Sequence, residues 1–420
     1  MLRWALLLAI LAYACLRPSL TKWIFVAMLL GAEIGYDFPA FGVSLRLLAQ
    51  IFLRLIKVII APLLFSTLVS GIAGHSDLKK VGRMGVKALV FFEIATTLAL
   101  LIGLAAINIS QAGVGAQLSS AAEPVKVENL TLNETILHSF PENIAKSVAE
   151  NQILQVVVFS LIFGIALALV KEEKRRPMLA FTESLAEVMF KFTNIVMWFA
   201  PLGIFGAIAS TVGASGIGVF GNLARLLLTL YAALAVFIIA VLLPVAILAK
   251  IPIRRFVAAI AEPSTIAFST ASSEAALPSA MERMEEFGVP RSMVAFVMPT
   301  GYSFNLTGSA LYLSLAAIFV AQAAGIHLSF GRQLYILLVL MLTSKGVAGV
   351  SRAGIVVLLA TAATVGLPVE PIFILLGIDQ LMDMGRTAVN VIGNCLATAV
   401  VARWEGDLAE NPLIADARSS

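Results

Sequence analysis

The chain has 420 residues, of which 60% are hydrophobic and only 13% are charged. A soluble domain carries about 25% charged residues, so this composition excludes an ordinary soluble enzyme and predicts a helical protein that crosses the membrane several times. The net charge of +4 is small, and no basic patch with interleaved aromatic residues indicates a nucleic-acid partner. The two cysteines lie in apolar surroundings, and no histidine has a partner at metal-ligand spacing.

Apolar runs dominate the first part of the chain. The first run, residues 4–16, has the length of a signal-peptide core, but it leads into Arg17 and Pro18 without the small residues of a cleavage site, so we expect it to be retained. A membrane-spanning helix needs about 20 apolar residues. The sequence predicts further spans over residues 23–36, 43–73, 81–110, 152–170, 178–212 and 218–249.

Basic residues lie at alternate ends of these spans, in the segments 75–83, 171–176 and 250–255. The remaining ends carry a long polar segment at 111–150 and an uncharged turn at 213–217. Because cytoplasmic loops are enriched in lysine and arginine, we expect the basic segments and the N-terminus in the cytoplasm and the polar segment outside.

After residue 250 the apolar segments are interrupted. Residues 258–281 and 333–365 each consist of two apolar halves around a tip of small or hydroxyl residues, and the segment 292–325 is broken in its middle by glycine and asparagine. Irregular backbone at membrane depth is tolerated only where it is buried in protein or lines an aqueous cavity, and paired interrupted segments indicate a transporter's binding site. We predict two re-entrant hairpins, entering from opposite sides, with a broken helix between them.

The last apolar segment, residues 369–404, carries a polar face. Its members are three or four residues apart, which places them within an arc of roughly 100° on a helix. They are Asp379, Asp383, Arg386, Thr387, Asn390 and Asn394. Ionisable groups at membrane depth cost at least ~2.5 kcal/mol each and usually face the bundle interior or a water-filled cavity. We predict a ligand site in a water-reachable pocket; the alternative is a polar stripe satisfied by partners within the bundle.

Four motifs indicate a family: SSEAALP at 272–278, YSFNLTGSALY at 302–312, SKGVAGV at 344–350 and DMGRTAVNVIGN at 383–394. In this order and spacing the chain resembles the glutamate transporter family, the dicarboxylate and amino acid:cation symporters, over nearly everything after residue 20. The resemblance implies an all-α polytopic membrane protein with eight transmembrane helices and two re-entrant helical hairpins. It also implies a homotrimer whose transport domains carry substrate across the membrane like elevators.

The same resemblance divides the chain into a scaffold and a transport domain. Residues 1–80 are expected to be mostly scaffold, and 81–110 to form a transport-domain helix. Residues 111–249 would supply scaffold and trimerisation helices with a share in the transport domain, and 250–404 the transport core. Residues 405–420 would be a cytoplasmic tail. We expect a multi-pass protein of the bacterial inner (plasma) membrane with both termini in the cytoplasm.

The resemblance implies roles for the polar face. Asp383 would accept the α-ammonium group of the substrate, and Arg386 would clamp its side-chain carboxylate, for which a bidentate guanidinium is well suited. Thr387 and Ser309 would assist at that carboxylate. An acidic amino acid carries one cation and two anions, so an aspartate and an arginine one turn apart complement two of its three charges.

Further substrate contacts are implied outside this pair. Asn390 and the first-hairpin residue Ser273 would hold the α-carboxylate. Val350 and Gly354 belong to the tip of the second hairpin, which would close over the substrate. The serines at 272–273 have no histidine base, and no HExxH helix occurs, so we expect no enzyme.

The chain departs from sodium-driven relatives at the cation ligands that the resemblance implies. Thr307, two residues after Asn305, stands where those relatives carry an aspartate, and Asn394 stands where they carry another. Phe92 and Ala95 stand where archaeal relatives carry tyrosine and threonine. Hard cations prefer carboxylate oxygens, so these three polar positions are remnants of cation sites. The substitutions weaken two of the family's three sodium sites.

A proton is the co-ion that we expect instead, without any cofactor. Glu93 lies inside an apolar span, as in proton-coupled bacterial members, and desolvation favours the neutral form of a carboxyl group. Glu274 is a second candidate, and the alternative for Glu93 is a hydrogen-bonded packing role.

The sequence therefore predicts a secondary active symporter that imports glutamate or aspartate with protons. The alternatives are a sodium-coupled symporter for acidic amino acids, a C4-dicarboxylate symporter and, in another class, an anion channel. Asp383 argues against a dicarboxylate, which has no ammonium group.

Overall fold

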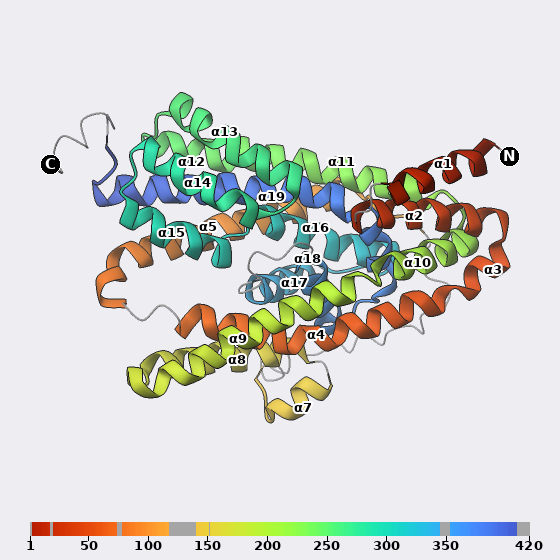
Figure 1. The fold of residues 1–420 in the computed structure, drawn as a ribbon, viewed down its shortest axis with the longest axis horizontal. Helices are drawn as coiled ribbons and strands as arrows, with labels where there is room; N and C mark the ends of the chain where they lie inside the picture. Colours follow the sequence, from red (N-terminus) through yellow and green to blue (C-terminus); the bar gives the residue numbers. More distant parts are fainter. Residues whose placement is uncertain are drawn as a thin grey trace.

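The computed structural model describes residues 2–16, 20–73, 78–116, 140–150, 152–344 and 353–409. Every regular element in these residues is a helix, and many of the long helices run along the long axis of the molecule (Figure 1). Three described helical stretches are each long and apolar enough to cross a membrane: Met84–Ser110, Val219–Leu248 and Arg291–Ala323. The predicted all-α class is confirmed, while eight crossings and two hairpins stay a prediction.

The helices follow the predicted segments closely. The first part of the chain contains α1 (Leu2–Leu16), α2 (Leu20–Asp37), α3 (Pro39–Ser44), α4 (Arg46–Ala73), α5 (Leu78–Ser110), α7 (Ile144–Ala149), α8 (Ile153–Leu169), α9 (Glu172–Met197), α10 (Ala200–Ser215), α11 (Val219–Phe237), a π-helical turn (Ile238–Leu242) and α12 (Leu243–Leu248). The remainder contains α13 (Ile253–Thr270), α14 (Ser273–Phe287), α15 (Arg291–Phe304), α16 (Thr307–Ala323), α17 (Phe330–Thr343), α18 (Ala353–Val365) and α19 (Glu370–Glu405).

The predicted interruptions are present as helix ends. Ala271 adopts a left-handed conformation, with φ of 49°, between α13 and α14. The broken helix divides at Asn305 and Leu306, where the backbone leaves the helical region. Residues 345–352 of the predicted second-hairpin tip, between α17 and α18, lie outside the described residues.

Three details differ from the predicted elements. The expected single span 178–212 is two helices, α9 and α10, which separate at Trp198 and Phe199, so that Pro201 lies in the first turn of α10, where a proline ring is readily accommodated. The span 43–73 likewise breaks at Leu45 between α3 and α4. The polar segment 111–150 contains the short helix α7, whose start is capped by the Asn143 side chain, which accepts a hydrogen bond of 2.9 Å from the Ala145 N–H.

The helices pack in two groups. One group is formed by α2, α3, α4, α8, α9 and α10, and the other by α5, α11, α13, α14, α15, α16 and α19. In Figure 1, α4, α8 and α9 lie along one side of the molecule, and α11, α13 and α19 along the other. The helix α19 joins the groups, because it also contacts α2 and α10.

The first apolar run forms α1, which packs antiparallel on α2. Arg3 at its start forms ion pairs of 3.0 Å with Glu33 and 2.9 Å with Asp37, and the Trp4 Nε1–H donates a hydrogen bond of 2.9 Å to Asp37. The first residues of α1 therefore lie beside the C-terminal end of α2, at the other end of that helix from Lys22.

Candidate functional site

The polar face predicted for the last segment lies on one continuous helix, α19. Its six residues, Asp379 to Asn394, are all buried and at most 5% exposed. The prediction that they share a helix is confirmed. Neighbouring helices cover this face in the part of the chain that the structure describes, and the predicted water-reachable pocket stays a prediction. Access of a small molecule to these buried side chains would require a covering element to move.

The guanidinium of Arg386 is the centre of this face. Its Nε donates a 2.7 Å hydrogen bond to Asp383, and its Nη1 lies 3.1 Å from the carboxylate of Asp379. The Tyr312 ring, on α16, lies 4.3 Å from the guanidinium carbon, within the range of a cation–π contact. Thr387 donates a 3.0 Å hydrogen bond to the same oxygen of Asp383. The residues predicted to bind the ammonium and carboxylate of a ligand are thus paired with each other.

Asp379 and Tyr312 are parts of this site to which the sequence assigned no role. Asp379 belongs to the polar face that the sequence predicted, and its pairing with Arg386 could have been expected from their spacing, because seven residues, about two helical turns, separate them on the same face. Tyr312 closes the motif YSFNLTGSALY, but only the packing of α16 on α19 reveals that its ring covers the guanidinium.

Asn390 connects α19 to the start of α16. Its side-chain oxygen accepts hydrogen bonds of 2.8 Å from the Gly308 N–H and 3.2 Å from the Ser309 N–H, and its amide donates to the Ser309 hydroxyl at 3.0 Å. The first N–H groups of a helix have no partner within it, so the break in the helix supplies donors that Asn390 satisfies. A Cβ at Gly308 would overlap the backbone oxygen of Arg386, so this close approach requires glycine.

The two predicted hairpins contribute differently to the described site. Gly354, at the start of α18, lies against Arg386, since a Cβ there would be 3.2 Å from Nη1. Ser273, in the first turn of α14, is buried, and within the described residues its hydroxyl forms no hydrogen bond. Val350 and the side chain of Glu274 lie outside what the structure describes.

The predicted cation-site remnants form a second buried cluster. The Asn305 amide donates a 2.9 Å hydrogen bond to Asn394, and within the described residues the Thr307 hydroxyl has no hydrogen-bond partner. A Cβ at Gly301 would lie 3.4 Å from the ring of Phe92, so an apolar ring adjoins this cluster. These groups are all neutral and include no carboxylate. They fit a hard cation poorly.

Glu93 lies on α5, which packs against α16, α17 and α19. The side chain is partly buried, with one carboxylate oxygen fully covered. Thr97, one turn on, donates a 2.7 Å hydrogen bond to the Glu93 carbonyl and lies 3.9 Å from the sulfur of Met341 on α17. This turn of α5 therefore faces the first half of the predicted second hairpin.

Comparison with known proteins gives consistent matches over most of the chain. Residues 20–404 match the sodium:dicarboxylate symporter family. The chain is 44% identical over 406 residues to a proton/sodium-glutamate symport protein of Bacillus caldotenax, covering 94% of this chain and 96% of the relative. It is 44% identical over 407 residues to C4-dicarboxylate transport protein 2 of Mesorhizobium japonicum, covering 95% and 92%. It is 42% identical over 367 residues to a proton/glutamate-aspartate symporter of Escherichia coli, covering 85% and 84%.

Proposed function

Since this chain belongs to the sodium:dicarboxylate symporter family, we propose that it imports glutamate or aspartate together with protons. The family and the relatives support the coarser statement, a membrane symporter for acidic amino acids or dicarboxylates. The choice of an amino acid rests on one observation, the contact of Asp383 with Arg386 on the buried face of α19.

An acidic amino acid exchanges this internal ion pair for two new ones. The substrate ammonium takes the place of the guanidinium at Asp383, and the side-chain carboxylate engages Arg386. Asp379 keeps its 3.1 Å contact with Nη1 of Arg386. The guanidinium therefore needs only to rotate while it stays paired with Asp379. Thr387, Ser309, Asn390 and Ser273 supply neutral donors for the two carboxylates. A dicarboxylate has no cation and would leave Asp383 without a cationic partner.

The charges of the site require a co-transported cation. With Asp379 and Asp383 ionised, the two carboxylates and the guanidinium of Arg386 sum to −1. A glutamate or aspartate adds another −1, and a doubly ionised dicarboxylate adds −2. An uncompensated charge in a buried site costs several kcal/mol, so at least one cation must enter with the substrate.

The neutral character of the second cluster favours protons over sodium. Thr307 and Asn394 offer no carboxylate oxygen, and Asn305 is engaged with Asn394. Glu93 lies on α5, and one of its carboxylate oxygens is fully buried. It is our first candidate for the proton carrier, and Glu274 is the second.

The packing supports an elevator mechanism. We assign α2, α3, α4, α8, α9 and α10 to a scaffold that would form a homotrimer, and α5 with most helices from α11 to α19 to a moving transport domain. The hairpins, the broken helix and the site all fall in the second group. The basic segments at 171–176 and 250–255 and the C-terminal residues would lie on the cytoplasmic side of a bacterial plasma membrane.

The test is uptake of labelled glutamate by proteoliposomes under an imposed pH gradient. We expect uptake to persist when choline replaces sodium at fixed pH and to collapse when a protonophore is added. Loss of uptake when choline replaces sodium would refute proton coupling and favour a sodium symporter. Succinate that competes as well as aspartate would refute the amino-acid assignment.

The second candidate is C4-dicarboxylate transport, favoured by the 44% identity to the Mesorhizobium japonicum protein. The same competition experiment decides between the two. A passive anion channel is separated from both by counterflow, since only a carrier exchanges L-glutamate saturably and stereoselectively across the liposome membrane.

A further inference from the structure

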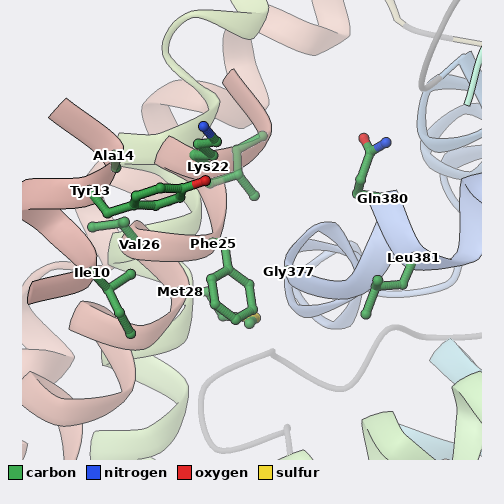
Figure 2. A pocket seen from close by; sticks show the side chains of 11 residues that line it. Ile10, Tyr13, Ala14, Lys22, Phe25, Val26, Met28, Gly377, Gln380 and Leu381 are labelled. Carbon is green, nitrogen blue, oxygen red and sulfur yellow. The ribbon is translucent and has the colours of Figure 1, made fainter. Parts of the chain in front are cut away.

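A cavity of about 350 Å³ lies between α1, α2 and α19 (Figure 2). Figure 2 shows Tyr13, Lys22 and Phe25 on one wall and Gln380 and Leu381 on the other. The cavity is at the small end of the range in which proteins bind ligands of moderate size. Nothing in the proposed transport of an amino acid uses this space.

The cavity is separate from the polar face of α19, although the same helix forms both. Leu381 at the cavity is 46% exposed, whereas Asp379, two residues away, is 1% exposed. Its other wall includes α1, which ends at Leu16, before the region 20–404 that matches the family. An element outside the shared family region therefore completes this cavity.

The lining is apolar except at one end. Tyr13, Phe25 and Leu381 are each about half exposed, so the cavity opens between large apolar side chains to the surface of the helices. The Lys22 ammonium lies 4.7 Å from the centre of the Tyr13 ring, and the Gln380 amide faces the same space from α19 (Figure 2). An apolar cavity with one cation and one amide at its end matches an amphiphile that has an anionic head.

We propose that this cavity binds an anionic phospholipid of the surrounding bilayer. One acyl chain would lie between α1, α2 and α19, and the phosphate would bind Lys22 and Gln380. A second copy of this chain is a poorer occupant, because a cavity of about 350 Å³ cannot admit a helix, whose diameter with side chains is about 10 Å. A lysine near the membrane surface favours an anionic lipid by about fivefold.

The position of the cavity indicates that a bound lipid would affect the movement of α19. This step rests on the proposed transport function. At its edge α2 and α19 touch, since a Cβ at Gly377 would lie 2.7 Å from the sulfur of Met28. A lipid seated beside this contact binds α1, α2 and α19 together. The lipid would stabilise the observed placement of α19 relative to α2, and release of the lipid would accompany a movement of α19.

Photo-crosslinking of the purified full-length protein tests the site without any substrate. The probes are phosphatidylglycerol and phosphatidylcholine with the same photoactivatable acyl chain, and the labelled peptides are mapped by mass spectrometry. We expect labels on α1, α2 and α19, with about fivefold more phosphatidylglycerol. Lys22→Gln should remove this preference but keep the phosphatidylcholine label. Lys171→Gln, at an exposed lysine before α9, is the matched control and should keep the preference.

Cavity filling provides the second arm. Val26→Trp fills the space from α2 and Leu381→Trp fills it from the exposed side of α19, so one variant serves if the other fails to fold. Both should abolish labelling of these peptides by either lipid. Undiminished labelling in a folded filled variant, or an equal lipid preference in Lys22→Gln and Lys171→Gln, would overturn the proposal. Glutamate uptake by the wild-type protein is measured separately, so its failure would refute the transport assignment and leave the lipid result standing.

Discussion

Replacing Asp383 by asparagine tests the assignment of an amino-acid substrate. Asparagine keeps the oxygen that accepts the 2.7 Å hydrogen bond from Arg386 and the 3.0 Å hydrogen bond from Thr387, so the shape of the site persists. What the variant loses is the negative charge that would face the substrate ammonium. Removing one partner of a buried charge pair costs about 3 to 5 kcal/mol, which corresponds to at least about 100-fold in affinity.

The same change has the opposite effect on a dicarboxylate. Asp383→Asn brings the sum of the three charged side chains of the site from −1 to zero, which lowers the repulsion that a dianion meets. We therefore expect glutamate affinity to fall at least about 100-fold and succinate affinity to stay or to rise.

Isothermal titration of the purified protein with each ligand, together with competition of labelled uptake in proteoliposomes, measures the two effects. Asp407→Asn, the same chemical change at an exposed residue just after α19, is the control and should alter neither affinity. Equal weakening of glutamate and succinate by Asp383→Asn would show that this carboxylate holds Arg386 in place and does not bind an ammonium group.

Three further substitutions test other parts of the site. Arg386→Ala should abolish uptake of acidic substrates and admit neutral amino acids, because the charge that binds the second carboxylate is lost; retained glutamate affinity would contradict the clamp. Glu93→Gln should flatten the response of glutamate uptake to the pH gradient, whereas the exposed control Glu183→Gln should respond as wild type. An unchanged response in Glu93→Gln would show that Glu93 does not carry the proton. Gly308→Ala should destabilise the protein by about 1 to 3 kcal/mol, seen as a lower melting temperature, because its Cβ overlaps the Arg386 carbonyl oxygen, while Gly221→Ala has free space and should not.

Local signals made most of the helices predictable. Apolar length and the spacing of polar residues located α19 and its polar face, and glycine with asparagine located the break between α15 and α16. These features depend on residues close together in the chain. The break before Pro201 was predictable in the same way, but the continuous apolar run on both sides concealed it.

Contacts between distant segments were not predictable from the sequence. The Tyr312 ring on the guanidinium of Arg386 depends on how α16 packs against α19, 74 residues apart in the chain. The fold-back of α1 depends on ion pairs between Arg3 and the end of α2. The polar pattern of α19 predicted a ligand site, but it could not indicate that Asp383 and Arg386 contact each other.

The pair of carboxylates at Arg386 meets two opposed requirements of a transporter. A buried guanidinium needs a counter-charge at all times, because an unpaired ion in the interior is costly, yet a substrate clamp must be able to leave its partner. Asp379 and Asp383 divide these tasks: the 3.1 Å contact with Nη1 can persist while the 2.7 Å contact with Nε is exchanged for a ligand. Gly354, at the start of α18, lies directly against Nη1. A movement of the guanidinium would therefore displace the start of α18 or be blocked by it. Under the proposed mechanism, an exchange of partners at Arg386 would therefore be coupled to α18, the second half of the predicted second hairpin.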